Sequence, residues 1–269
     1  MAVAILGSDG QLGRHVPGEI RLGRGQADLA DPASVYKALD AVRPNGVILT
    51  AAYTNVDGCE SNRDYAMAVN GEGPAHVARW CQAHDAWVLY ISSNCVFDGE
   101  KKSAYVEEDT PRPISVYGES KLAGELGVGA ECPRHYIVRT SWLFGPGSSN
   151  FVTKVLQLAS GRTELVGVAD EIASPTYAPE LAPLLPRLAA SGRYGLYHLT
   201  NDGACSRLEY MEEILRLAGL GRTLQPIRLA DFRRPSRPPA QSALANHHAA
   251  ALGLALRPWR EALAEYMER

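Results

Sequence analysis

The stretch "AVAILGSDGQLG" (residues 2–13) sets an apolar run directly before three glycines, spaced as Gly7-x-x-Gly10-x-x-Gly13. Such a run is typical of a strand that is buried on both faces of a parallel sheet. Glycines after it allow a tight turn, a close approach of the backbone to a pyrophosphate, and close packing of the next helix. The stretch predicts the first strand and phosphate-binding turn of a dinucleotide-binding domain, with a plain tight turn as the alternative.

Further apolar runs follow this start at intervals and alternate with helical patterns. The runs are "GVILTAA" (46–52), "WVLYISS" (87–93) and "HYIVRTS" (135–141), and "EIRLGRG" (19–25) is a further expected strand. The expected helices are "DPASVYKALDAVRP" (31–44), which begins with an Asp cap and a proline, and "NGEGPAHVARWCQAH" (70–84). Pro17-Gly18 should cut the first helix short. This alternation predicts an α/β fold of the Rossmann type, a doubly wound parallel sheet.

The β-α rhythm is lost after Phe144, and prolines and arginines become denser from residue 226 onward. We expect residues 1–150 to form the NAD(P)-binding Rossmann domain, with a returning segment around 165–200. Residues 201–269 should form a smaller α/β substrate-binding lobe over the C-terminal edge of the sheet, where open α/β sheets bind ligands.

Composition argues for an ordinary enzyme of the cytoplasm. The chain has 269 residues and a net charge of −3, and its one basic cluster is "RRPSRPP" (233–239), which excludes a footprint for nucleic acid or an anionic membrane. Its five cysteines are scattered without the spacing of a disulfide framework or a zinc site. Because it shows neither a signal peptide nor a stretch of about 18 apolar residues, we expect no export and no membrane insertion.

Two hydroxyl-bearing motifs add candidate catalytic groups. Tyr117 and Lys121, in "SVYGESKLAGE" (115–125), stand four positions apart and so share one helix face, although such a pair alone is more often two solvated neighbours. Ser92 and Ser93 end an apolar strand, where a turn is the ordinary interpretation. Because parallel strands end at one edge of the sheet, serine, tyrosine and lysine can meet there, and together with the glycine turn they favour a catalytic site.

The choice of coenzyme depends on the residues after the second expected strand. An acid about 20 positions past the first glycine binds a ribose hydroxyl, whereas an arginine there accommodates a 2′-phosphate. Arg21 and Arg24 occupy this stretch, and no acid stands between Glu19 and Asp28. NADPH is therefore expected, with NADH compatible. Two alternatives stay open, namely that both arginines are solvated surface charges or that Asp28 is the ribose acid.

The ordered set of motifs resembles the extended short-chain dehydrogenase/reductases and, within them, the dTDP-4-dehydrorhamnose reductase family. The matching segments run the length of the chain and are "GSDGQLG" (7–13), "TAAYTNVDGCE" (50–60), "AMAVNGEGP" (66–74), "SSNCVFDG" (92–99), "YGESKLAGE" (117–125), "RTSWLFGPGSSNFV" (139–152), "ADEIASPTYAPELA" (169–182), "GLYHLTNDGACSRLEY" (195–210), "RPPAQSAL" (237–244) and "RPWREAL" (257–263). The set is specific for the family and less specific for the exact substrate.

This resemblance implies a role for each candidate catalytic residue. Tyr117 would protonate the C4 carbonyl oxygen of a keto sugar as hydride arrives from the nicotinamide. Lys121 would bind the nicotinamide ribose and lower the pKa of the tyrosine, since a nearby cation favours the phenolate. Ser93, where the family often has threonine, would donate a hydrogen bond to the same carbonyl oxygen.

The resemblance also implies which residues bind the two ligands and which partners to expect. The expected coenzyme-binding residues are Gly7, Gly10, Gln11, Leu12, Gly13, Arg21, Arg24, Asp28, Leu29, Ala51, Ala52, Tyr53, Tyr117 and Lys121. The expected substrate-binding residues are Ser93, Asn94, Cys95, Trp142 and Arg237. A buried core tryptophan is the alternative for Trp142. The partner would be a dTDP-sugar, and a homodimer is compatible.

The chain departs from the family pattern at several positions. It has Ser92-Ser93-Asn94-Cys95 where the family commonly has Ser-Thr-Asp-Tyr, so the charge and the phenol near the sugar are lost. Glu171 stands where glutamine is usual. His15 stands where some members have a metal-linked glutamate, and no metal site is therefore expected.

Three hypotheses for function remain. Reduction of dTDP-4-dehydro-β-L-rhamnose to dTDP-β-L-rhamnose, or of a related 4-keto sugar nucleotide, is favoured. Another sugar-nucleotide enzyme, such as an epimerase, would keep Tyr117 and Lys121 but retain its coenzyme between turnovers. A noncatalytic subunit that resembles the regulatory β subunit of methionine adenosyltransferase is the third. The presence of Tyr117, Lys121 and Trp142 favours catalysis.

Overall fold

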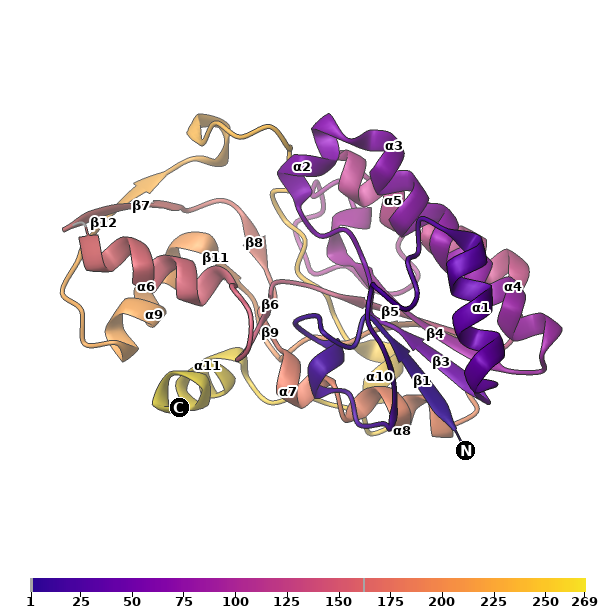
Figure 1. Cartoon of the computed structure of the whole chain (residues 1–269). Coiled ribbons are helices and arrows are strands. Elements are labelled where there is room, and N and C mark those ends of the chain that lie inside the picture. Colours follow the sequence, from indigo (N-terminus) through magenta and orange to yellow (C-terminus); the bar gives the residue numbers. More distant parts are fainter. Residues whose placement is uncertain (1, 162) are drawn as a thin grey trace.

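A six-stranded parallel sheet, in the order β10-β5-β4-β3-β1-β2, forms the centre of the larger part of the molecule (Figure 1). The computed structural model describes residues 2–161 and 163–269. The strands are β1 (Val3–Leu6), β2 (Ile20–Leu22), β3 (Gly46–Leu49), β4 (Trp87–Ser93), β5 (His135–Thr140) and β10 (Gly195–His198). All five runs expected as strands lie in this sheet, so the predicted Rossmann-type α/β fold is confirmed.

Helices cover both faces of the sheet. One face is covered by α1 (Pro32–Val42), α3 (Arg63–Ala66), the π-helix η2 (Met67–Glu72), α4 (Gly73–Ala83) and α5 (Val116–Glu131), and α2 (Val56–Ser61) packs on α5. The other packs against α7 (Ala178–Leu181), α8 (Leu184–Ala190) and α10 (His247–Ala250). The expected cap of α1 is present, because the side chain of Asp31 accepts a hydrogen bond from the backbone N–H of Ala33 at 3.0 Å.

The turn after β1 requires its glycines. Gly7 has φ +84°, and a Cβ added there would lie 2.4 Å from the backbone nitrogen of Ala51. A Cβ on Gly13 would lie 2.2 Å from the carbonyl oxygen of Gly7. Only a single 3-10 turn, η1 (Gly13–His15), follows before the break at Pro17-Gly18. The glycines therefore hold the turn close to the end of β3, and a single 3-10 turn rather than a long helix follows it.

A smaller lobe with its own core packs beside the sheet. Its elements are β6 (Leu143–Phe144), α6 (Phe151–Gly161), β7 (Glu164–Val168), β8 (Ile172–Ala173), β9 (Thr176–Tyr177), β11 (Cys205–Ser206), α9 (Arg207–Leu217), β12 (Thr223–Ile227), η4 (Leu229–Asp231) and α11 (Trp259–Glu268). Phe144, Tyr210, Ile214 and Trp259 are buried at its centre. Across the described residues, no helix has the length and apolar character needed to cross a membrane.

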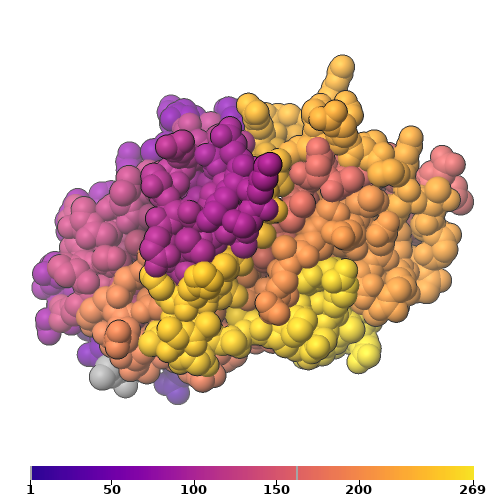
Figure 2. All heavy atoms as spheres, turned by 180° about the vertical axis from the view of Figure 1, so that it is seen from behind, coloured from indigo at the N-terminus to yellow at the C-terminus, as the bar shows by residue number. Residues whose placement is uncertain are grey.

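The chain passes more than once between the sheet and the smaller lobe. Residues after β12 return to the larger part, where the N–H of Tyr105 donates to Ala243 and its carbonyl accepts from Ala245, both at 2.8 Å. Figure 2 shows these C-terminal residues in yellow against both the magenta residues near 100 and the orange residues of the lobe. By packing, α6 and β7 belong with the smaller lobe and β10 with the sheet. The division of function at residues 150 and 201 stays a prediction.

Candidate active site

A pocket of about 540 Å³ opens at the C-terminal ends of β1, β3, β4 and β5, where the smaller lobe meets the sheet. Most of the predicted site residues line it, namely Gly7, Gly10, Gln11, Leu12, Arg24, Asp28, Leu29, Ala51, Ala52, Ser93, Asn94, Cys95, Tyr117, Lys121 and Trp142. Segments far apart in the sequence are thus brought to one cavity, as the shared edge of a parallel sheet requires.

Four of the predicted residues lie outside this lining: Gly13, Arg21, Tyr53 and Arg237. The guanidinium of Arg21 donates to the carbonyls of Val16 at 3.1 Å, Ser8 at 3.0 Å and Gly13 at 2.8 Å, and so holds the glycine turn. The ring of Tyr53 packs edge-on against Tyr65. Arg234, which the sequence analysis did not single out, lines the pocket in the region where Arg237 was expected.

The end of the pocket beside β2 combines a cation with an acid. Arg24 pairs with Asp28, with 3.6 Å between Nε and Oδ2, and its side chain remains 74% exposed. Its guanidinium also lies 5.8 Å from the ring centre of Tyr65. Ala27 and Leu29 add buried apolar surface at this end. Arg24 can therefore reach an anionic group there without losing a buried ion pair.

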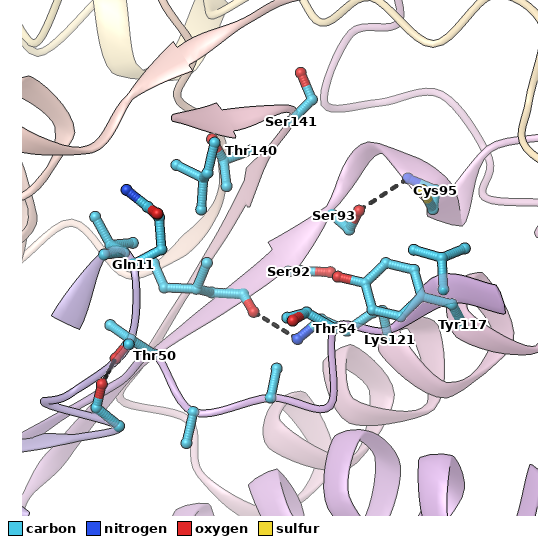
Figure 3. A pocket seen from close by; sticks show the side chains of 18 of the residues that line it. Gln11, Thr50, Thr54, Ser92, Ser93, Cys95, Tyr117, Lys121, Thr140 and Ser141 are labelled. Carbon is cyan, nitrogen blue, oxygen red and sulfur yellow. Dashed lines mark hydrogen bonds between the residues drawn. The ribbon is translucent and has the colours of Figure 1, made fainter. Parts of the chain in front are cut away.

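The three candidate catalytic side chains lie together at the other end. Ser93 ends β4 and precedes the 3-10 turn η3 (Asn94–Val96), while Tyr117 lies in the first turn of α5, whose N-cap Ser115 accepts from the N–H of Gly118 at 3.2 Å. Figure 3 shows Ser93 and Cys95 beside the Tyr117 ring and Lys121 below it. Tyr117 and Lys121 therefore line one pocket, and their catalytic role stays a prediction.

Hydrogen bonds within the protein fix Ser93 and Lys121. The Ser93 hydroxyl donates to Oδ1 of Asn94 and accepts from the N–H of Cys95, both at 3.2 Å. The ammonium of Lys121 donates to the carbonyl of Ile91 at 2.7 Å and is 1% exposed. Both groups keep further hydrogen-bonding capacity toward the pocket.

Burial governs the ionisation of the catalytic pair. Desolvation raises the pKa of Tyr117, negative charge at Cys95 would raise it further, and the hydroxyl of Ser93 lowers it. Desolvation lowers the pKa of Lys121 to about 7, and the carboxylate of Glu125 opposes this change. At neutral pH the phenol consequently keeps its proton, as a general acid must, while the amine is poised between its two forms.

Three residues that depart from the family pattern are either neutral or part of an ion pair. The amide of Asn94 donates to Oγ of Ser242 at 2.7 Å, and this ties the strand end to a residue 148 positions later. Burial raises the pKa of the Cys95 thiol, which favours its neutral form. Glu171 is buried and pairs with Nε of Arg207 at 3.2 Å.

Trp142 is half-buried and lines the pocket, with the guanidinium of Arg207 3.5 Å from its ring centre. A second cavity of about 340 Å³ adjoins it and is lined by the aromatic rings Trp142, Phe151 and Phe232 and by the cations Lys154, Arg207 and Arg234. The three cations were missed in the sequence because no motif spacing connects them. Only the packing of α6, α9 and the segment after β12 brings them together.

One group of side chains among the described residues has the spacing of metal ligands. Atoms of Glu107, Glu108 and His248 lie within 4.8 Å of one another. The group lies outside the pocket lining, and Nε2 of His248 already lies 2.7 Å from the Glu108 carboxylate. His15 lies against the carbonyl of Pro146 at 3.3 Å. The expected lack of a metal stays a prediction.

The chain is similar to known proteins over its whole length. The model of the "RmlD substrate binding domain" family matches residues 1–269. The dTDP-4-dehydrorhamnose reductase of Streptomyces griseus is 38% identical, over 97% of this chain and 91% of that protein. The corresponding reductase of Mycobacterium tuberculosis H37Rv is 37% identical, with the same coverage.

Solved structures of dTDP-4-dehydrorhamnose reductases are also similar to this chain over its whole length. The structure of a dTDP-4-dehydrorhamnose reductase from Clostridium acetobutylicum has a TM-score of 0.96 and 35% identity, and covers 100% of this chain and 99% of its own. That of the Bacillus anthracis reductase in complex with NADP has a TM-score of 0.95 and 33% identity, with the same coverage. An NAD complex of Thermus thermophilus UDP-glucose 4-epimerase, at 19% identity and a TM-score of 0.83, shares the fold.

Proposed function

Because the chain belongs to the RmlD substrate-binding-domain family, we propose that it reduces the 4-keto group of a dTDP-activated deoxysugar with NADPH. The favoured reaction converts dTDP-4-dehydro-β-L-rhamnose to dTDP-β-L-rhamnose. The observation that carries the proposal is the convergence of Ser93, Tyr117 and Lys121 with the glycine turn in one pocket. Reductases of this substrate that are 37–38% identical over nearly the whole chain support it.

The pocket fits a nicotinamide dinucleotide. The turn after β1 is held against β3 by glycines that leave no room for a Cβ, so its backbone can approach a pyrophosphate. Arg24 supplies a cation at the adenosine end, and the Bacillus anthracis relative binds NADP. NADPH is the coenzyme, with NADH compatible through Asp28 as a ribose ligand.

Each of the three catalytic side chains has a separate role in the reduction. Bound NADPH supplies the hydride. Tyr117 donates its phenolic proton to the carbonyl oxygen of the sugar, which requires the protonated form that its desolvation favours. Ser93 turns its hydroxyl from Asn94 to the same oxygen and stabilises the charge that develops there. Lys121, as an ammonium, binds the nicotinamide ribose and promotes proton release from Tyr117.

The nucleotide part of the substrate would extend into the cavity beside Trp142. Lys154, Arg207 and Arg234 offer three cations to a diphosphate, although Arg207 pairs with Glu171 and Arg234 with Asp57. The aromatic rings offer stacking surface for a base. Asn94 and Cys95 would lie near the sugar, where a neutral amide and thiol replace the charge and the phenol that the family commonly has.

The test is to mix purified protein with NADPH and the keto sugar and to follow nicotinamide absorbance. The proposal requires consumption of NADPH in proportion to substrate. An epimerase would instead retain its coenzyme and consume none. A regulatory subunit would leave the absorbance unchanged with every dTDP-keto sugar in a panel, and this result would overturn the proposal.

Three further expectations belong to this proposal. We place the reaction in the cytoplasm, where NADPH and nucleotide sugars are available. We assign coenzyme binding to the part with the six-stranded sheet and substrate binding to the smaller lobe. A homodimer is tested by light scattering, which gives about 58 kDa for two copies of a 29.1 kDa chain.

A further inference from the structure

A buried ion pair lies beneath the catalytic pocket. The carboxylate of Glu125, on α5, accepts from Nε of Arg139 at 2.8 Å and from Nη2 at 2.6 Å. It also accepts from the hydroxyl of Ser92 at 2.5 Å. Ser92 and Arg139 are register partners on β4 and β5, and the exposure of Arg139 and Glu125 is 2% and 5%. Three elements thus hold one carboxylate in a fixed position.

Glu125 lies one helical turn after Lys121 on α5. The two residues are four positions apart on α5, which places them on the same face one turn apart. The ammonium of Lys121 bonds to the carbonyl of Ile91, and the carboxylate of Glu125 receives a bond from the next residue, Ser92. Both side chains therefore reach the same short segment of β4.

Glu125 is the opposite charge that faces Lys121 among the groups packed around it. The ring centre of Tyr90, on β4, is 4.2 Å from the ammonium, and the phenol of Tyr117 and the thiol of Cys95 line the same pocket as Lys121. Burial raises the pKa of each of these three groups and so favours its neutral form. From β5 comes Arg139, whose positive charge is directed at Glu125.

We infer that Glu125 is a positioning residue that keeps Lys121 protonated in the pocket. An ammonium without a partner is costly to bury and tends to lose its proton. The ion pair with Arg139 and the bond from Ser92 fix the position of the Glu125 carboxylate one helical turn from the lysine. The inference rests on the proposed function, because that function needs the charged form of Lys121 to bind the ribose and to assist Tyr117.

Glu125→Gln tests this role because it removes the charge and keeps the shape. Coenzyme affinity needs the ammonium, so it is present below the pKa of Lys121 and is lost as pH rises through that pKa, about 7 in the parent protein. The variant should lose affinity for NADPH at a lower pH, by about one unit or more, which is about fivefold weaker binding at pH 7 and about tenfold well above it. Glu125→Asp keeps the charge and should restore the parent profile.

Two controls separate this role from a structural one. Glu180→Gln removes one of the two carboxylates that pair with Arg257 away from the pocket, and should cost stability without moving the pH profile. Because Glu125→Gln leaves Arg139 buried and unpaired, its double variant with Arg139→Gln removes both charges and is expected to fold. The double variant should move the profile in the same direction by a smaller amount.

Fluorescence titration across pH 5–9 measures the affinity of each variant for NADPH without any sugar substrate. Failure of the inference is thereby distinguished from failure of the proposed reaction. A parent-like pH profile of NADPH affinity in both Glu125→Gln and the double variant would overturn the role of Glu125, even if the parent protein reduces the keto sugar.

Discussion

Arg24→Ala is expected to weaken NADPH binding and to leave NADH binding nearly unchanged. Arg24 is the arginine of the β2 exit that lines the pocket, whereas Arg21 is occupied by three carbonyls of the glycine turn. The 2′-phosphate distinguishes the two coenzymes, so only a residue that contacts this phosphate can affect one and spare the other.

The size of this effect follows from the environment of Arg24. A charge-assisted hydrogen bond contributes roughly 1.5–3 kcal/mol, or about 10- to 150-fold in affinity. Arg24 is 74% exposed, and its bond to Asp28 must loosen when it turns to a phosphate. Both features reduce the gain, and we expect the lower end, about tenfold.

Fluorescence titration of both coenzymes at one salt concentration measures the difference. Arg21→Ala is the matched control, because losing its three hydrogen bonds should disturb the glycine turn and weaken both coenzymes alike. Equal weakening of NADPH and NADH by Arg24→Ala would refute the assignment.

Two further variants test separate parts of the site and fold. Ser93→Ala should reduce turnover by roughly 10²-fold or more in steady-state assays if the hydroxyl stabilises the developing oxyanion, and turnover within twofold of the parent would make Ser93 a turn residue. Burial lowers the pKa of His198 from 6.5 to about 3, so the unfolded chain takes up a proton that the folded chain does not, and stability falls as pH drops from about 6.5 toward 3. His198→Asn should lose less stability than the parent in urea denaturation between pH 7 and pH 5, and an equal loss would contradict this cause.

The sheet and the core of the site followed from local sequence patterns. Buried strands have continuous apolar runs, and the glycine turn, the serine at the strand end and the Tyr-x-x-x-Lys spacing are each contained in a short segment. Because parallel strands end at one edge, their order alone places Ser93 near Tyr117. These features can be predicted without knowing which distant segments of the chain pack together.

The partners of individual polar side chains could not be predicted in this way. Arg21 points to the carbonyls of the turn because β2 pairs in register with β1, and the amide of Asn94 meets Ser242 only after the chain returns from the smaller lobe. Glu125 meets Arg139 through the docking of α5 on β5. Such contacts form between segments that are far apart in the sequence, and no local sequence pattern indicates that these segments pack together.

Turnover of Tyr117→Phe tests the central claim most directly. The substitution removes the phenolic hydroxyl, keeps the ring and leaves Lys121 in place, so NADPH affinity should change little. Reduction of the dTDP-4-keto sugar should fall by about 10²–10⁴-fold, the usual contribution of general acid catalysis. Near-parental turnover of Tyr117→Phe, on a substrate that the parent protein reduces well, would contradict the mechanism.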